Sequence, residues 1–254
     1  MPRANVKDKR KAQLIAATLD SIAKRGLQET TITHISKGAG MSRGIINFYF
    51  TSKEAMLLDT LRTLVEEYDA HWQEAIAPEK NLKGQARLVA LASAHFSKKL
   101  CQAKRLNIMS AFWGHAATHS AYRDVLRKSD TALELALSES WKQAGVTEQE
   151  APQVARQNHA LIRGLWLAFM LCPQDSDREG LLAECSAFIE QRLGAQKISG
   201  NNAAKRRILD SNAPTHFSSN VTSLTAAKSV AKRPQKASGL EGQMDIEDLF
   251  AGLK

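Results

Sequence analysis

The chain has 254 residues, 43% of them hydrophobic, and a formal net charge of +9. This composition excludes a chain that is disordered throughout, and the length can bury one large core or two smaller ones. The positive charge lies at the two ends. Residues 1–54 carry 10 Lys/Arg and 4 Asp/Glu, residues 55–196 carry 16 and 17, and residues 197–254 carry 9 and 5. Clustered basic charge of this kind favours a polyanionic partner.

Several features indicate a cytoplasmic protein. The N-terminal segment MPRANVKDKRKAQ is charged and lacks the apolar run of a signal peptide. No stretch approaches the roughly 18 apolar residues of a membrane span, so we expect no membrane partner. Cys101, Cys172 and Cys185 are an odd number without paired spacing, which is typical of reduced thiols.

The periodicity of the apolar residues predicts an all-α fold, because almost every segment up to residue 193 repeats at helical spacing and none alternates like a strand. Capping boxes are predicted at Thr51–Glu54, Thr147–Glu150 and Ser176–Glu179, and glycine helix ends at Gly26 and Gly194. The predicted helices cover approximately residues 8–25, 31–39, 43–50, 52–72, 84–102, 104–118, 119–144, 148–171 and 177–193.

Near the N-terminus, a helix, a turn containing Gly40 and a second short helix form the unit that places its second helix in the DNA major groove. Ile46 and Phe50 should point inward. Arg43 can bond a guanine edge or a phosphate, and Asn47 can read an adenine or hold the backbone. The positions expected to face outward are Arg43, Gly44, Ile45, Asn47, Phe48 and Tyr49.

Residues 10–58 resemble the DNA-binding domain of the TetR family of regulators. The resemblance rests on Thr31-x-x-x-Ile35, Ala39-Gly40-Met41-Ser42, Tyr49-Phe50, and Ser52-Lys53-Glu54 followed by Leu57-Leu58. Asn47 stands where the family often has Tyr, so the base preference at that contact stays open. By this resemblance the DNA-contacting residues are Thr31, Ser42, Arg43, Gly44, Ile45, Asn47, Phe48, Tyr49 and Lys53.

The resemblance also implies three parts: a helix-turn-helix domain over 1–54, a helical effector-binding and dimerisation domain over 55–196, and a tail. The last two helices, 148–171 and 177–193, are apolar on more than one face, which favours burial against a second subunit. A homodimer would place its reading helices about 34–36 Å apart on a palindromic operator of double-stranded DNA. Residues 197–254 are expected to form a disordered basic tail with a short amphipathic end.

A narrower resemblance links the middle of the chain to the choline-sensing BetI branch of this family. It rests on Ala111-Phe112-Trp113-Gly114, Ala121-Tyr122-Arg123 and the segment 161–167. An aromatic cage suits a quaternary ammonium ligand such as choline, although aromatic residues at helical spacing are more often ordinary core. Arg163 stands where the choline sensors should have an acid, so an anionic or other effector stays open. The implied effector-binding residues are Phe112, Trp113, Tyr122, Arg163 and Trp166.

Other chemistry has weaker signals. His115 and His119 are one helical turn apart, but no third ligand is evident, so we expect no metal site. No phosphate loop, nucleophile elbow or paired Cys-x-x-Cys motif is present, so we expect no cofactor and no enzyme. The sequence predicts a repressor that a small molecule releases from DNA. The alternatives are an architectural DNA-binding protein without a ligand, a regulator with a non-choline effector, and an enzyme that its DNA-binding head localises.

Overall fold

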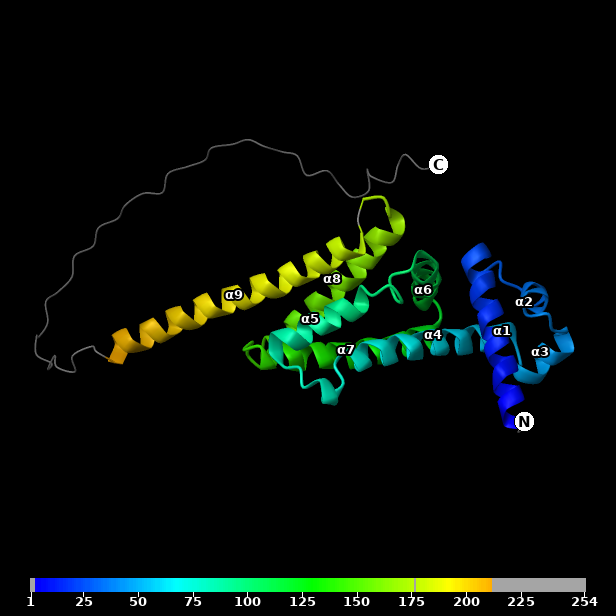
Figure 1. The fold of residues 1–254 in the computed structure, drawn as a ribbon, viewed down its shortest axis with the longest axis horizontal. Coiled ribbons are helices and arrows are strands. Elements are labelled where there is room, and N and C mark those ends of the chain that lie inside the picture. The colour runs from blue at the N-terminus through cyan, green and yellow to red at the C-terminus, as the bar shows by residue number, and fades with distance from the viewer. Residues whose placement is uncertain (1–2, 176, 212–254) are drawn as a thin grey trace, which may run out of the picture. The chain divides into compact units, whose positions relative to one another are not determined.

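The computed structural model describes residues 3–175 and 177–211, and every regular element in this part of the chain is helical (Figure 1). The all-α prediction is confirmed. No helix among the described residues is long and apolar enough to cross a membrane. The helices are α1 (Arg3–Arg25), α2 (Ile32–Ala39), α3 (Arg43–Tyr49), α4 (Lys53–Ala75), α5 (Gly84–His95), α6 (Ala103–Ala116), α7 (Ser120–Gln143), α8 (Ala151–Leu171) and α9 (Arg178–Ser211), with a short 3₁₀ turn, η1 (Pro78–Lys80), before α5.

Three clusters of buried apolar side chains hold the helices together. The smallest joins α1, α2, α3 and the start of α4 through residues such as Leu14, Ile35 and Ile46, all fully buried. A second joins α1, α4, α6 and α7. The largest joins α4, α5, α6, α7, α8 and α9, and it includes Trp141 at 0% exposure. Because α4 contributes to all three clusters, it is the element that links the first three helices to the rest.

The start of α4 corrects one prediction. The cap is Ser52, whose side-chain oxygen accepts a hydrogen bond from the Ala55 amide at 3.0 Å, and its backbone is extended as an N-cap requires. The predicted capping box at Thr51 is therefore wrong by one residue. Glu54 consequently lies in the first turn of α4, where the helix dipole favours a carboxylate.

The other two predicted boxes fare differently. The Thr147 hydroxyl accepts a hydrogen bond from the Glu150 amide at 3.3 Å and donates to the Glu150 carboxylate at 2.9 Å, but these contacts lie in the turn before the helix. α8 begins at Ala151 with Glu150 as its N-cap residue, so the helix start predicted at Thr147 is wrong by three residues. At the start of α9 the cap is Asp177, which accepts a hydrogen bond from the Gly180 amide at 2.7 Å. The residue predicted to cap that helix, Ser176, lies outside the described residues.

Of the two glycines predicted to end helices, Gly26 does so and Gly194 does not. Gly26 has a positive φ of 82°, which fits the left-handed cap expected there. Gly194 does not end its helix, because α9 continues through it to Ser211. Residues 197–211 are therefore helical rather than part of a tail without structure, and their run of Ala, Lys, Arg and Leu has good helix propensity. The remainder of the predicted tail, residues 212–254, lies outside the described residues.

Candidate DNA-binding surface and effector cavity

The turn between α2 and α3 is fixed by backbone geometry. Gly40 adopts the left-handed conformation, with φ of 62° and ψ of 31°. The amide of Met41 then donates to the Ser36 carbonyl at 3.1 Å, which closes the end of α2. The Ser36 hydroxyl donates in return to the Met41 carbonyl at 2.5 Å. These contacts set the angle at which α3 leaves α2, so the predicted tight turn is confirmed.

Two of the predicted DNA-contacting residues serve as helix caps. The Thr31 hydroxyl oxygen accepts a hydrogen bond from the His34 amide at 3.2 Å, at the start of α2. The Ser42 hydroxyl oxygen accepts one from the Ile45 amide at 3.4 Å, at the start of α3. Both residues are exposed, so each hydroxyl is at the surface while it stabilises its own helix.

α3 has one buried and one open face. Ile46 is fully buried and Phe50, which follows the helix, is 6% exposed, as predicted. Phe48 is 74% exposed, which is unusual for an aromatic side chain. The expected outward set holds only in part, because Ile45 and Tyr49 are half-buried and Tyr49 packs against the first cluster. We call the exposed residues of this helix the α3 surface: Arg43, Gly44, Asn47 and Phe48.

Two basic side chains, Arg43 on the α3 surface and Lys53 at the start of α4, are oriented by uncharged partners. The Arg43 guanidinium donates to the Thr33 hydroxyl of α2. The Lys53 ammonium donates to the Gln28 carbonyl at 2.9 Å, across the turn that follows α1. Since neither acceptor carries a charge, both side chains are positioned while their positive charge remains available to a phosphate.

Packing within the protein does not require a glycine at position 44. A Cβ atom at this position would meet nothing closer than the Ser42 hydroxyl oxygen at 3.8 Å, and the residue has ordinary helical geometry. Alanine is preferred to glycine in a helix by about 0.5–1 kcal/mol. A glycine on an exposed helix face therefore indicates a surface that another molecule approaches closely.

The second candidate site is a small cavity enclosed by α4, α6, α7 and α8 and by the segment after α5. Its volume is about 30 Å³, room for about two water molecules. We call it the Trp113–Trp166 cavity. Its lining is mostly apolar with a few charged groups, and consists of Val65, Tyr68, Leu100, Arg105, Leu106, Met109, Trp113, Leu126, Ser129, Asp130, His159, Arg163 and Trp166.

The two tryptophans form its aromatic wall. Their rings are nearly parallel, at 12°, with centroids 6.5 Å apart. The Trp166 indole N–H donates to the His95 carbonyl at 3.2 Å, and Tyr68 meets the Trp166 ring edge to face at 5.8 Å. The position of Trp166 is thus fixed by a buried hydrogen bond as well as by packing.

The charged groups of the cavity come from two facing helices. Arg163 of α8 is ion-paired with Asp130 of α7, and its guanidinium lies 5.5 Å from the centre of the Trp113 ring. One turn earlier on α8, the His159 Nδ1 lies 3.0 Å from Glu134, and its Nε2 lies 3.7 Å from Asp130. Burial, reinforced by the neighbouring Arg163, lowers the pKa of His159 even though Glu134 opposes this. The imidazole is therefore neutral near neutral pH and donates to Glu134.

Tyr68, which lines the cavity, forms a buried polar pair with His95. The Tyr68 hydroxyl lies 2.9 Å from the Nε2 of His95, and the Nδ1 of His95 lies 2.6 Å from the Leu91 carbonyl. Since a carbonyl only accepts, Nδ1 donates and Nε2 accepts from Tyr68. Burial lowers the pKa of His95 to about 4 and raises that of Tyr68. Both side chains are therefore uncharged and satisfied, as buried groups must be.

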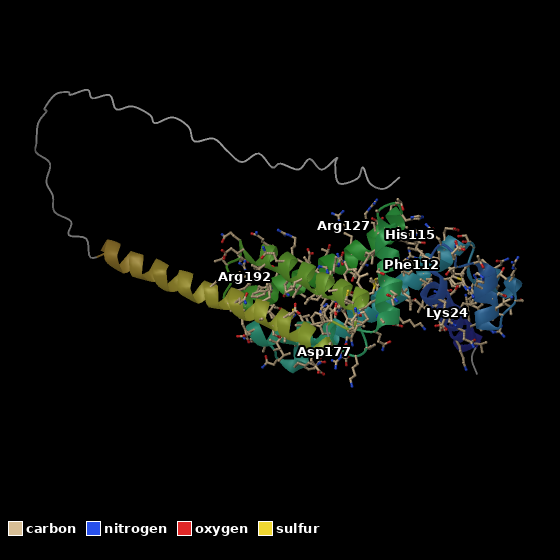
Figure 2. All side chains as sticks on the ribbon, turned by 90° about the horizontal axis from the view of Figure 1, so that it is seen from above. Lys24, Phe112, His115, Arg127, Asp177 and Arg192 are labelled. Carbon is tan, nitrogen blue, oxygen red and sulfur yellow. The ribbon has the colours of Figure 1, made fainter. Side chains whose placement is uncertain are left out.

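The predicted aromatic cage is not assembled as a whole. Trp113, Trp166 and Arg163 meet at the cavity, whereas Phe112 and Tyr122 do not line it. Phe112 of α6 (Figure 2) is fully buried in the second cluster. Its ring packs edge to face against that of Tyr122, with centroids 5.4 Å apart. The physical reason is helical geometry: Phe112 is turned about 100° around α6 from Trp113, and this direction takes its ring into the second cluster instead of the cavity.

Sequence reasoning missed Tyr68, Asp130 and His159. A signal for the last two was present, because Asp130 and Glu134 on α7 and His159 and Arg163 on α8 are each one turn apart. The paired histidines His115 and His119 lie with ring centroids 5.7 Å apart. Within the described residues, no group of three His, Cys, Asp or Glu side chains is placed to hold a metal ion.

A helix-turn-helix with free cations on its open face, followed by a larger helical unit, defines a DNA-binding transcriptional regulator. Comparison with known proteins agrees. Residues 14–60 match the sequence profile of the bacterial regulatory proteins of the tetR family, and residues 84–194 match that of the BetI-type transcriptional repressor C-terminal domain. The chain belongs to the TetR family, within its BetI-type branch.

Individual relatives each cover about three quarters of the chain. The transcriptional regulator BetI of Burkholderia mallei is 30% identical over 193 residues, which is 76% of this chain and 98% of that protein. A solved transcriptional regulator of Pseudomonas aeruginosa PAO1 is 27% identical with a TM-score of 0.68, over 74% of this chain and 92% of its own. A regulator from Saccharomonospora viridis, solved in complex with choline, shares the fold at 20% identity and a TM-score of 0.61, over 72% and 96%.

Proposed function

We propose that this regulator is a repressor that binds a palindromic operator as a homodimer and is released by a small molecule held in the Trp113–Trp166 cavity. The observation that carries the DNA-binding half is the α3 surface. Arg43, Asn47 and Phe48 are exposed there without contributing to the core, and Gly44 leaves room for close approach. Arg43 and Asn47 supply base or phosphate contacts, and Lys53 and the capping hydroxyls of Thr31 and Ser42 supply phosphate contacts.

The homodimer half of the proposal rests on α8. Its inner face is buried through residues such as Val154 and Ile162, yet a second apolar stripe remains exposed on its outer face. Leu167 is 46% and Leu171 65% exposed. An apolar stripe along the second half of a helix needs a cover, and a second copy of the same helix supplies one by two-fold symmetry. The stripe consists of Ala160, Gly164, Leu167, Ala168 and Leu171.

α4 supplies the connection between the two sites. Lys53 at its first turn borders the α3 surface, and Tyr68 further along lines the cavity. A ligand that shifts α4 at the cavity would therefore move the α3 helices of a dimer relative to each other. For this to release DNA, the ligand must bind better to the conformer whose helix spacing does not fit the operator.

Choline is the first effector to test, because the BetI-type relatives and the choline complex of the Saccharomonospora viridis regulator point to its chemical class. One observation favours a second candidate function. The cavity is small in this conformation, which suits a DNA-binding protein that needs no ligand. A third candidate is a regulator of the same kind whose effector is a small molecule other than choline.

The experiment is a titration of the full-length protein on the DNA upstream of its own gene, with and without millimolar choline. We expect tight, salt-dependent binding that choline weakens. The variant Arg43→Ala should bind less tightly, whereas Arg127→Ala, which removes an exposed charge on α7, should bind as the wild type does. Binding that choline leaves unchanged keeps the DNA-binding proposal and removes choline. Absence of sequence-specific binding overturns the proposal.

The dimer is tested separately by light scattering. Leu167→Glu places a charge in the centre of the exposed α8 stripe and should give a monomer that unfolds normally but binds the operator weakly. Glu184→Ala on an exposed position of α9 is the control. A wild-type protein that is monomeric at micromolar concentration would contradict the homodimer.

A further inference from the structure

The ring face that a cationic ligand would use is already covered by the protein. The Arg163 guanidinium lies 5.5 Å from the centre of the Trp113 ring, within the range of a cation–π contact. Trp166 lies against Trp113 with the two rings nearly parallel, so the ring that this guanidinium contacts is itself held in place by packing. Arg163 thus occupies the place of a ligand's cation.

The same guanidinium also uses the acidic group of the cavity. Asp130 is its ion-pair partner, and the two side chains are 28% and 38% exposed. Arg105, the other cation of the lining, is paired outside the cavity with Glu67 at 3.0 Å. Of the described charged groups that line the cavity, Arg163 and Asp130 are therefore the pair that a ligand would meet, one of each sign.

The charge of a ligand decides what happens to this pair. A simple cation that takes over Asp130 and the Trp113 face leaves Arg163 without its partner beside a second positive charge. A simple anion that takes over Arg163 leaves Asp130 unpaired in the same way. Breaking a partly buried pair from one side is costly, because the remaining charge is desolvated without compensation. A ligand that carries both charges replaces both partners at once.

We propose, on the basis of the effector cavity assigned above, that Arg163 selects the charge class of the effector and that this class is a small zwitterion. The alkylated ammonium end lies on the Trp113 face beside Asp130. The carboxylate end pairs with Arg163, which turns toward solvent. The cavity of about 30 Å³ requires this movement, since it holds about two water molecules until the guanidinium leaves. The partial exposure of Arg163 gives the side chain a path outward.

Four compounds of nearly identical shape separate the charge classes. Glycine betaine is the zwitterion and choline the cation. The anion is 3,3-dimethylbutyrate, and the neutral compound is 3,3-dimethylbutan-1-ol; in both, carbon replaces the ammonium nitrogen. Binding of each to the full-length protein is measured by calorimetry without DNA. We expect glycine betaine to bind at least about tenfold more tightly than the other three, since choline and the anion each lose one charge-assisted contact and the neutral compound loses both.

The variant Arg163→Gln keeps a polar, hydrogen-bonding side chain and removes its charge. The variant should bind glycine betaine about tenfold more weakly and choline more tightly than the wild type does, so that the order of the two affinities reverses. A residue with a purely structural role would change both in the same direction. Arg156→Gln is the matched control, because Arg156 is an exposed arginine two turns earlier on α8 and the charge change is the same. It should leave the order unchanged.

A preference for glycine betaine that Arg163→Gln reverses supports the proposal. Three results overturn it: choline, the anion or the neutral compound binding most tightly to the wild type; an unchanged order in Arg163→Gln; or no binding of any of the four to either protein. Operator binding without ligand is measured on the same samples. If the wild-type protein does not bind the operator without ligand, the repressor function itself is contradicted. A different ligand preference contradicts only the role proposed for Arg163.

Discussion

The α3 surface and the Trp113–Trp166 cavity differ in how far the fold depends on the residues that each presents. At the α3 surface, Phe48 and Arg43 lie outside the core and contact it little. At the cavity, Trp166 and Tyr68 are both binding wall and buried core, and they belong to one of the three apolar clusters. The difference teaches that affinity for DNA can change without loss of stability, whereas the effector pocket can change only together with the packing around it.

Two phenylalanines sharpen this comparison most. Phe112→Ala removes a fully buried ring and should lower the free energy of unfolding by about 3–5 kcal/mol. Phe48→Ala removes an exposed ring and should change it by less than about 0.5 kcal/mol. Urea unfolding of the two variants measures both values. Similar losses in the two proteins would show that α3 is part of the folding core and would break the contrast.

The pH dependence of stability tests the buried side of the comparison. Burial lowers the pKa of His95 in the folded protein to about 4, below its ordinary value of 6.5. Below pH 6.5 the unfolded chain therefore binds the proton more readily, and the free energy of unfolding falls as the pH falls. His95 alone should account for a loss of about 3 kcal/mol between pH 6.5 and 4. His159, whose pKa is also lowered, adds a loss of the same sign.

Chemical unfolding at a series of pH values measures this loss. His95→Gln lacks the titrating group, so its stability should be lower at pH 7 but should depend less on pH over the same range. His34→Gln, at an exposed hydrogen bond of α2, is the control and should keep the wild-type profile. A His95→Gln profile as steep as that of the wild type would assign the acid sensitivity to other groups.

On the open side of the comparison, Arg43→Ala should reduce operator affinity by about 1–3 kcal/mol, roughly tenfold to a hundredfold, while the free energy of unfolding stays unchanged. Fluorescence anisotropy with specific and scrambled DNA measures the two losses. A loss confined to the specific site assigns Arg43 to a base, and an equal loss on both, with a shallower salt dependence, assigns it to a phosphate. A fall in stability as large as the fall in affinity would instead make the Thr33 contact structural.

The same comparison explains what the sequence could predict. The α3 surface is built from one short segment, so the inward positions Ile46 and Phe50 and the Ser42 cap follow from local periodicity and capping rules. Local rules also made errors here: Thr51 was predicted as the cap in place of Ser52, because two adjacent residues can both cap, and Ile45 and Tyr49 were expected to face outward but are half-buried. The cavity joins residues from α4 to α8, and no local pattern says which faces of these helices meet. Trp113, Arg163 and Trp166 were found through resemblance, whereas Tyr68 and Asp130 required the structure.

The smallest expected effect is also the one in which stability and affinity move in opposite directions. Gly44→Ala adds a Cβ that meets nothing closer than 3.8 Å and improves helix propensity, so the free energy of unfolding should rise by up to about 0.5–1 kcal/mol. Operator affinity should fall, because the new methyl group stands between α3 and the DNA. Thermal unfolding and DNA titration of one preparation measure both changes. Gly114→Ala, on an exposed position of α6 with no atom near its Cβ, is the control and should be stabilised without any loss of DNA binding. If Gly44→Ala binds DNA as tightly as the wild type does, α3 does not approach the operator along this face, and the contacts proposed for Arg43 and Asn47 must come from a different orientation of the helix.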